Sequence, residues 1–154
     1  MTQYATVLGI HSWLRWVTLL LAIGATLNAL RGDTDISLRP PGRHWDTFFM
    51  MALDIQVLFG LLLYFGLSPF TRRALAVLGA AMRDPGLRFW TFEHIGAMLT
   101  AVVLVRIGRV LALTAKTPVA RRRKRLVFFG LTTLAIIAGI PWPGLPNGRP
   151  LFRL

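Results

Sequence analysis

Long apolar runs dominate this sequence and limit what the chain can fold into. It has 154 residues, of which 55% are hydrophobic, and its mean hydropathy is +0.57. A run of about 20 apolar residues can cross a bilayer as a helix, which satisfies its own backbone hydrogen bonds there. We therefore predict an all-α, polytopic membrane protein with one domain, 1–154, built as a bundle of four transmembrane helices. The expected spans are about 4–30, 45–67, 89–113 and 125–140.

The segments outside these runs are expected to lie at the membrane surface. TRRALAVLGAAM follows the second run and predicts a short interfacial helix that starts at Thr71 as its N-cap. After the fourth run, PWPGLPNGRPLFRL is rich in proline and predicts an irregular tail over 141–154. No basic region precedes the first run and no cleavage site is evident, so we expect a retained helix rather than a signal peptide.

The net charge of +12 comes largely from basic residues between the apolar runs. No nucleic-acid fold signature accompanies these residues, so we expect contact with anionic lipid and no nucleic-acid partner. Loops one and three together carry nine cations, whereas the N-terminus, loop two and the tail carry six. By the positive-inside rule, this bias predicts both termini on the periplasmic side of a bacterial inner membrane.

Two histidines are predicted to lie at the same depth in the membrane. His11 is about seven residues into the first expected span and His94 about five into the third, and both spans start on one side. At about 1.5 Å of rise per residue, both imidazoles lie roughly 8–10 Å below that boundary. An ionisable residue at such a depth is by default a functional-site hypothesis. The pair is a candidate to ligate a metal or a haem iron; the alternative interpretation is two hydrogen-bonded contacts between helices.

Other residues narrow the choice of cofactor. The chain has no cysteine, which excludes iron–sulfur clusters, thiolate ligands and covalently attached c-type haem. Carboxylates are too few for a zinc or di-iron centre, so haem b is the favoured cofactor. Arg15, one helical turn after His11, and Arg88, just before His94, are expected to meet haem propionates or Glu93. His44 lies at the opposite boundary and is expected to be solvated.

A second polar layer is predicted deeper in the membrane. Asp54 in the second span and Arg106 in the third each lie roughly 10–12 Å from the cytoplasmic boundary. We expect them to form an ion pair, because pairing neutralises two charges that are costly in lipid. The alternative is a proton or quinone-headgroup site that also uses Gln56 and Arg109.

Four motifs occur in this order along the chain: HSWLRW in the first expected span, RFWTFEHIGAM and VRIGR in the third, and IPWP at the end of the fourth. In this respect the chain resembles a family of small four-helix bacterial membrane proteins labelled cytochrome b or b561-like, and the similarity covers most of its length. The resemblance implies a four-helix bundle that holds haem b through His11 and His94. Many members carry histidine in the second span, in an H-I-Q stretch. Here that stretch is Asp54-Ile55-Gln56, which excludes a ligand at that position and argues against a second haem.

The favoured function is therefore a membrane electron carrier with one haem b, which exchanges electrons with a quinol or with a larger partner complex. The alternative is a non-catalytic accessory or scaffold subunit of a larger membrane complex, or a homo-oligomer, with histidines that bind no cofactor. An ion transporter is a weaker third interpretation, because four short spans show no inverted repeat and few intramembrane acids.

Overall fold

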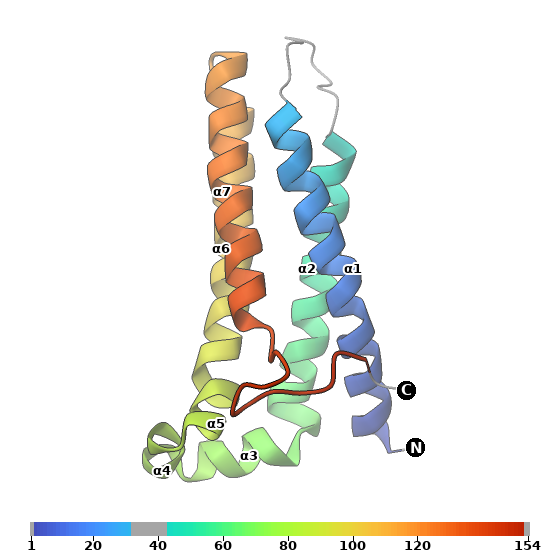
Figure 1. The fold of residues 1–154 in the computed structure, drawn as a ribbon, viewed down its shortest axis with the longest axis vertical. Coiled ribbons are helices and arrows are strands. Elements are labelled where there is room, and N and C mark those ends of the chain that lie inside the picture. Colours follow the sequence, from blue (N-terminus) through green and yellow to red (C-terminus); the bar gives the residue numbers. More distant parts are fainter. Residues whose placement is uncertain (1, 32–42, 153–154) are drawn as a thin grey trace.

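The protein is described by a computed structural model that covers residues 2–31 and 43–152. Within these ranges the chain is helical and contains no strand (Figure 1). The four long helices are α1, Gln3–Arg31; α2, Arg43–Leu61; α6, His94–Leu113; and α7, Pro118–Gly139. Two π-helical segments, η1 (Leu62–Leu67) and η2 (Phe89–Glu93), extend α2 and precede α6. Three short helices lie between them: α3, Pro69–Ala76; α4, Leu78–Arg83; and α5, Pro85–Arg88.

Three helical stretches are long and apolar enough to cross a membrane: Gln3–Arg31, His44–Leu67 and Pro85–Leu113. This property makes the chain a membrane protein. Helix α7 is of comparable length, with 22 residues, but its first half carries the basic run RRRKR. The fourth span, expected over 125–140, therefore rests on the sequence pattern alone.

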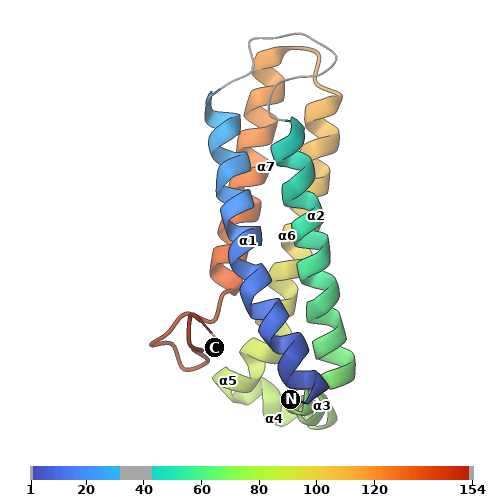
Figure 2. The same ribbon diagram turned by 90° about the vertical axis from the view of Figure 1, so that its right-hand side faces the viewer.

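The four long helices run side by side along the longest axis of the molecule (Figures 1 and 2). Helix α1 packs against α2 and α7, and α6 packs against α7 and α2. Large buried side chains fill the space between them, among them Phe49, Leu53, Val105 and Phe129. Small residues bring the helices close: a Cβ atom at Gly108 of α6 would collide with Phe128 of α7.

The segment between α2 and α6 differs from the single helix that the sequence predicts. Ser68, not Thr71, is the N-cap of α3, and its hydroxyl accepts a hydrogen bond from the Thr71 backbone N–H at 3.3 Å. The prediction of Thr71 as the cap was wrong, because its own hydroxyl donates back to the carbonyl of Tyr64 at 2.9 Å. The helix is interrupted at Val77 and again at Asp84, whose carboxylate caps α5.

The opposite end of the molecule contains a buried charge network. Arg125 of α7 donates to Asp46 of α2 at 2.6 Å and to Asn28 of α1 at 3.2 Å. The side chains of Arg125 and Asp46 are only 7% and 11% exposed. Arg125 is buried although its neighbours Arg122 and Arg123 are exposed, because its side chain reaches from α7 to Asp46 of α2 and Asn28 of α1.

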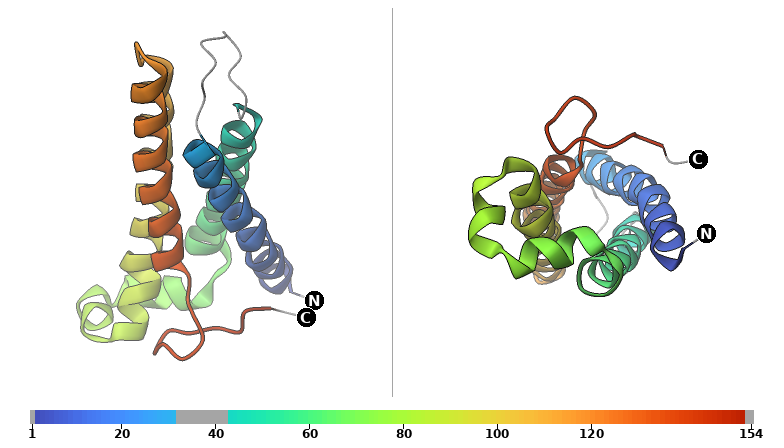
Figure 3. Two further views of the ribbon diagram at one scale, coloured as in Figure 1. Left: turned by 45° about the horizontal axis from the view of Figure 1, so that its top comes forward. Right: turned by 90° about the horizontal axis from the view of Figure 1, so that it is seen from below.

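After α7, the chain turns back across the same end of the molecule where α1 starts (Figure 3). Residues 141–152 form turns and bends, with no helix or strand among them. The carbonyl of Leu151 accepts hydrogen bonds from Arg15 Nη2 at 2.7 Å and from Trp16 Nε1 at 3.0 Å. Phe152 stacks on Trp16 with ring centres 5.5 Å apart. These contacts hold the tail against α1.

Candidate cofactor site

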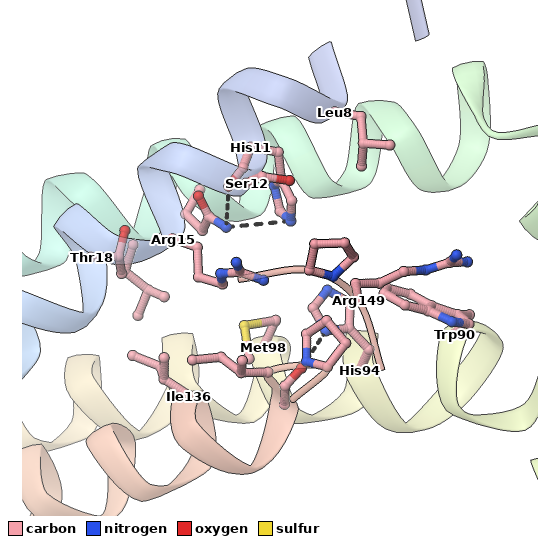
Figure 4. Close-up of a pocket in the computed structure, with 16 residues that line it drawn as sticks. Leu8, His11, Ser12, Arg15, Thr18, Trp90, His94, Met98, Ile136 and Arg149 are labelled. Carbon is pink, nitrogen blue, oxygen red and sulfur yellow. Dashed lines mark hydrogen bonds between the residues drawn. The ribbon is translucent and has the colours of Figure 1, made fainter. Parts of the chain in front are cut away.

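His11 and His94 come together between the helices (Figure 4). His11 lies in the first half of α1, and His94 is the first residue of α6. Their ring centres are 6.3 Å apart, and the ring planes are inclined by 77°. The structure therefore brings together the two imidazoles that the depth argument paired.

His94 is held in one orientation by α7. Its Nδ1 lies 2.7 Å from the carbonyl oxygen of Gly139. Because a carbonyl only accepts, Nδ1 carries the hydrogen, and in the neutral ring Nε2 keeps its lone pair. Histidines that ligate metals are oriented by the same kind of bond from the second ring nitrogen. The helices α6 and α7 pack closely here, since a Cβ at Gly139 would lie 3.2 Å from the Cβ of Ala97.

His11 is held by α2 through Gln56, which is buried. The Gln56 amide nitrogen lies 3.3 Å from His11 Nε2 and donates to the His11 carbonyl at 3.1 Å. The other ring nitrogen, His11 Nδ1, is buried and has no hydrogen-bond partner within the described ranges. Because the Gln56 amide nitrogen donates, His11 Nε2 accepts and Nδ1 carries the hydrogen of the neutral ring. A buried N–H without a partner costs free energy, so a hydrogen-bond acceptor at this place would be stabilising.

Cavities adjoin both imidazoles. A cavity of about 290 Å³ lies between them and the end of the molecule where α1 begins; its other wall residues include Leu8, Gly60, Leu63, Tyr64, Phe70 and Trp90. A smaller one, of about 60 Å³, continues inward, and its walls include Arg15, Thr18, Met98 and Ile136 (Figure 4). The larger volume is close to the lower end of the range for small-molecule sites, which are mostly apolar with a few convergent polar groups, about 300–1,000 Å³.

Two arginines line these cavities, and only one of them was predicted from the sequence. Arg15 lines the inner cavity, as expected. Arg88 does not line either cavity: it forms an ion pair of 2.7 Å with Glu93, and both side chains are more than 40% exposed. The second cation is Arg149, which lines both cavities and lies over the ring of Trp90, 5.4 Å from its centre.

Sequence reasoning missed Arg149 because it lies in the segment expected to be irregular, far from the histidines along the chain. It reaches the cavity only because the tail folds back onto α1. Tyr64 and Trp90 were likewise not singled out as site residues, and they line the larger cavity. A run of apolar residues contains no local signal for which aromatic side chains face inward.

Asp54 and Arg106 are also brought together, at a place separate from the histidines. Arg106 Nη2 donates to Asp54 Oδ1 at 2.7 Å. Gln56, two residues after Asp54, points the other way and contacts His11. Residues two apart on a helix do not share a face. The quinone-headgroup alternative, which combined Gln56 with Asp54 and Arg106, is therefore not assembled in this structure.

The donor set indicates what the histidines could hold. The ring centres are 6.3 Å apart, so both imidazoles could reach one bound group. Among the described residues no third histidine, cysteine or carboxylate joins the pair. Two imidazoles thus fit a group that brings its own in-plane ligands, as a haem does, and the two nearby arginines fit its anionic propionates.

No protein-family model matches this chain, and comparison with the curated proteins and with the solved structures finds no match either. The class that the fold and the site define is a helical membrane protein with a paired-histidine cavity near one end of its helices. This cavity is the feature of the fold from which a function can be inferred.

Proposed function

We propose that the protein is a small b-type cytochrome of the bacterial inner membrane, which carries electrons through one haem b held between His11 and His94. The observation that carries this proposal is the pair of neighbouring imidazoles, with ring centres 6.3 Å apart beside a cavity of about 290 Å³. The orientation of His94 by Gly139, which leaves the lone pair of His94 Nε2 free, supports the same assignment. The resemblance of the four motifs to cytochrome b-like proteins agrees with it.

The residues around the pair would each have a defined task. His11 and His94 would ligate the iron; Gly139 would hold the His94 ring, and Gln56 would hold α1 through the His11 carbonyl. Arg15 and Arg149 would balance the propionates. Trp90 and Tyr64 would keep lipid and water from the iron. Haem b supplies a one-electron couple, and the chain would set its potential through ligation, burial and the two cations.

The proposal includes the four-span topology. Helix α7 would be the fourth span, and Arg125 within its basic turns would remain inside the protein through Asp46. The cation excess in loops one and three would place those loops in the cytoplasm and both termini in the periplasm. The histidine pair then lies near the periplasmic face, where a quinol or a partner complex would exchange electrons with the haem.

The proposal is tested by a reduced-minus-oxidised absorption spectrum of the protein purified after expression with haem supplied. We expect a low-spin b-type spectrum with about one haem per chain, as bis-histidine ligation implies. His44→Ala is the matched control, because His44 is exposed and lies at the start of α2. This variant should keep the full spectrum. Purified protein without a b-type band would contradict the assignment.

Removing Arg149 is expected to lower the midpoint potential of the haem. In Arg149→Gln a positive charge beside the cavity is lost, so adding an electron becomes less favourable, by on the order of tens of millivolts. A redox titration followed by absorbance measures the shift. Arg88→Gln is the control, because it removes a cation that is paired with Glu93 away from the cavity. Equal shifts in the two variants would show that Arg149 has no special position.

The second candidate is an accessory subunit of a larger membrane complex. It is favoured by one observation: both imidazoles already have partners in the chain, Gln56 and Gly139, as structural histidines do. The spectrum separates the two proposals. A haem-free protein that co-purifies in fixed ratio with other membrane proteins would support the accessory role.

A further inference from the structure

The ion pair of Asp54 and Arg106 lies on the outer surface of the helices that carry it. The side chains are 45% and 50% exposed, respectively. Asp54 is near the middle of the membrane-compatible stretch His44–Leu67, and Arg106 belongs to Pro85–Leu113. In a membrane, an outward surface at this position faces lipid or another protein. Charged residues in spans normally face the protein interior, so this pair stands out.

The pair leaves much of its hydrogen-bonding capacity unused. A guanidinium has five N–H donors and a carboxylate has several acceptor positions. Within the described part of the chain, the contact between Arg106 Nη2 and Asp54 Oδ1 is the one hydrogen bond of either side chain. In hydrocarbon no water is present to satisfy the rest, and each unsatisfied group is costly. A polar surface that meets the pair would remove this cost.

The surroundings of the pair are apolar. One helical turn away on α2, Met51 and Leu58 are exposed, and on α6 the same is true of Val103 and Val110. Exposed aliphatic side chains by themselves are explained by contact with lipid, so they do not indicate a protein partner. Combined with a charge pair at their centre, they form a surface with an apolar border and a polar middle. We call this surface the α2–α6 face.

We propose that the α2–α6 face is the contact surface of a homodimer, in which Asp54 of each copy meets Arg106 of the other. The charges of the two copies are complementary in this contact. Two copies inserted in the same direction are related by a two-fold axis along the membrane normal, which leaves the depth of every residue unchanged. Asp54 and Arg106 share one depth because they touch. A two-fold contact pairs each residue with its complement, so four alternating charges would close into one ring.

The absence of cysteine from the chain allows a direct test. Leu58→Cys and Val103→Cys each put one thiol on the α2–α6 face, and both positions are more than half exposed. Leu20→Cys is the control, because Leu20 is 68% exposed on α1. After mild oxidation in native membranes, we expect the first two variants to give several-fold more disulfide-linked dimer than the control on a non-reducing gel.

A second arm tests the charges. In the Val103→Cys background, Arg106→Gln should reduce the dimer yield several-fold, whereas Arg88→Gln, which removes a cation of α5 that is paired with Glu93, should leave it unchanged. Equal cross-linking at Leu20 and Val103, or none at either face position, would overturn the proposal. So would a cross-linked product whose mass requires a different protein, because the α2–α6 face would then bind another partner. The outcome does not depend on whether haem is bound.

Discussion

His94→Ala is expected to abolish the b-type spectrum of the purified protein. His94 is one of two imidazoles that meet beside the cavity, and its Nε2 is left with a lone pair because Nδ1 donates to Gly139. Without this ring a haem would keep one protein ligand at most. His11→Ala should have the same effect. A low-spin spectrum that survives either substitution would mean that the assigned ligands are wrong.

The substitution to alanine also removes the contact between α6 and α7, so a loss of haem could reflect loss of structure. His94→Gln separates these effects. The glutamine amide can still donate to the Gly139 carbonyl, but it is a poor iron ligand. We expect His94→Gln to lose the spectrum while the haem-free protein unfolds at nearly the wild-type detergent concentration. If His94→Gln loses the haem spectrum and also unfolds at a much lower detergent concentration, His94 is mainly structural.

Asp46→Ala is expected to destabilise the protein by about 3–5 kcal/mol, the cost of removing one partner from a buried ion pair. Arg125 and Asp46 are 7% and 11% exposed, and their contact is 2.6 Å. The substitution leaves the Arg125 guanidinium buried without its carboxylate. The double variant Asp46→Leu with Arg125→Met should recover most of the loss, because no uncompensated charge remains.

Unfolding by a denaturing detergent in mixed micelles, followed by tryptophan fluorescence, measures these differences. Glu93→Gln is the control, because it removes one member of an ion pair that is more than 40% exposed. Such pairs contribute about 0–1 kcal/mol. If Asp46→Ala costs no more than Glu93→Gln, the buried network does not hold α7 against α1 and α2. A double variant as unstable as the single one would show that the ion pair is itself stabilising.

Hydropathy and helical rise, both local properties, predicted much of this protein. Three of the expected spans correspond to helices that can cross a membrane. The positions of His11 and His94 along their helices were enough to pair them, because depth follows from residue count at a constant rise per residue. The same count placed Asp54 and Arg106 at one level, where the structure has them in contact.

Other features depended on contacts that no local pattern encodes. Arg149 reaches the cavity because the tail returns to α1 through the carbonyl of Leu151. A backbone carbonyl is present in every residue, so its use as an anchor leaves no trace in the sequence. For Arg88 the sequence left two partners open, a propionate or Glu93, and the structure has the ion pair with Glu93.

The sequence by itself determined which segments are helical and apolar, and which ionisable residues of different helices lie at one level, because composition and rise act along single helices. The tertiary structure decided how each helix is rotated about its axis. That rotation buries Arg125 against Asp46, turns Gln56 to His11 and leaves Asp54 on the outer surface. Rotation is set by side-chain packing between helices, at positions such as Gly108 and Gly139 where two backbones come close. An apolar run with similar residues on all sides does not specify it.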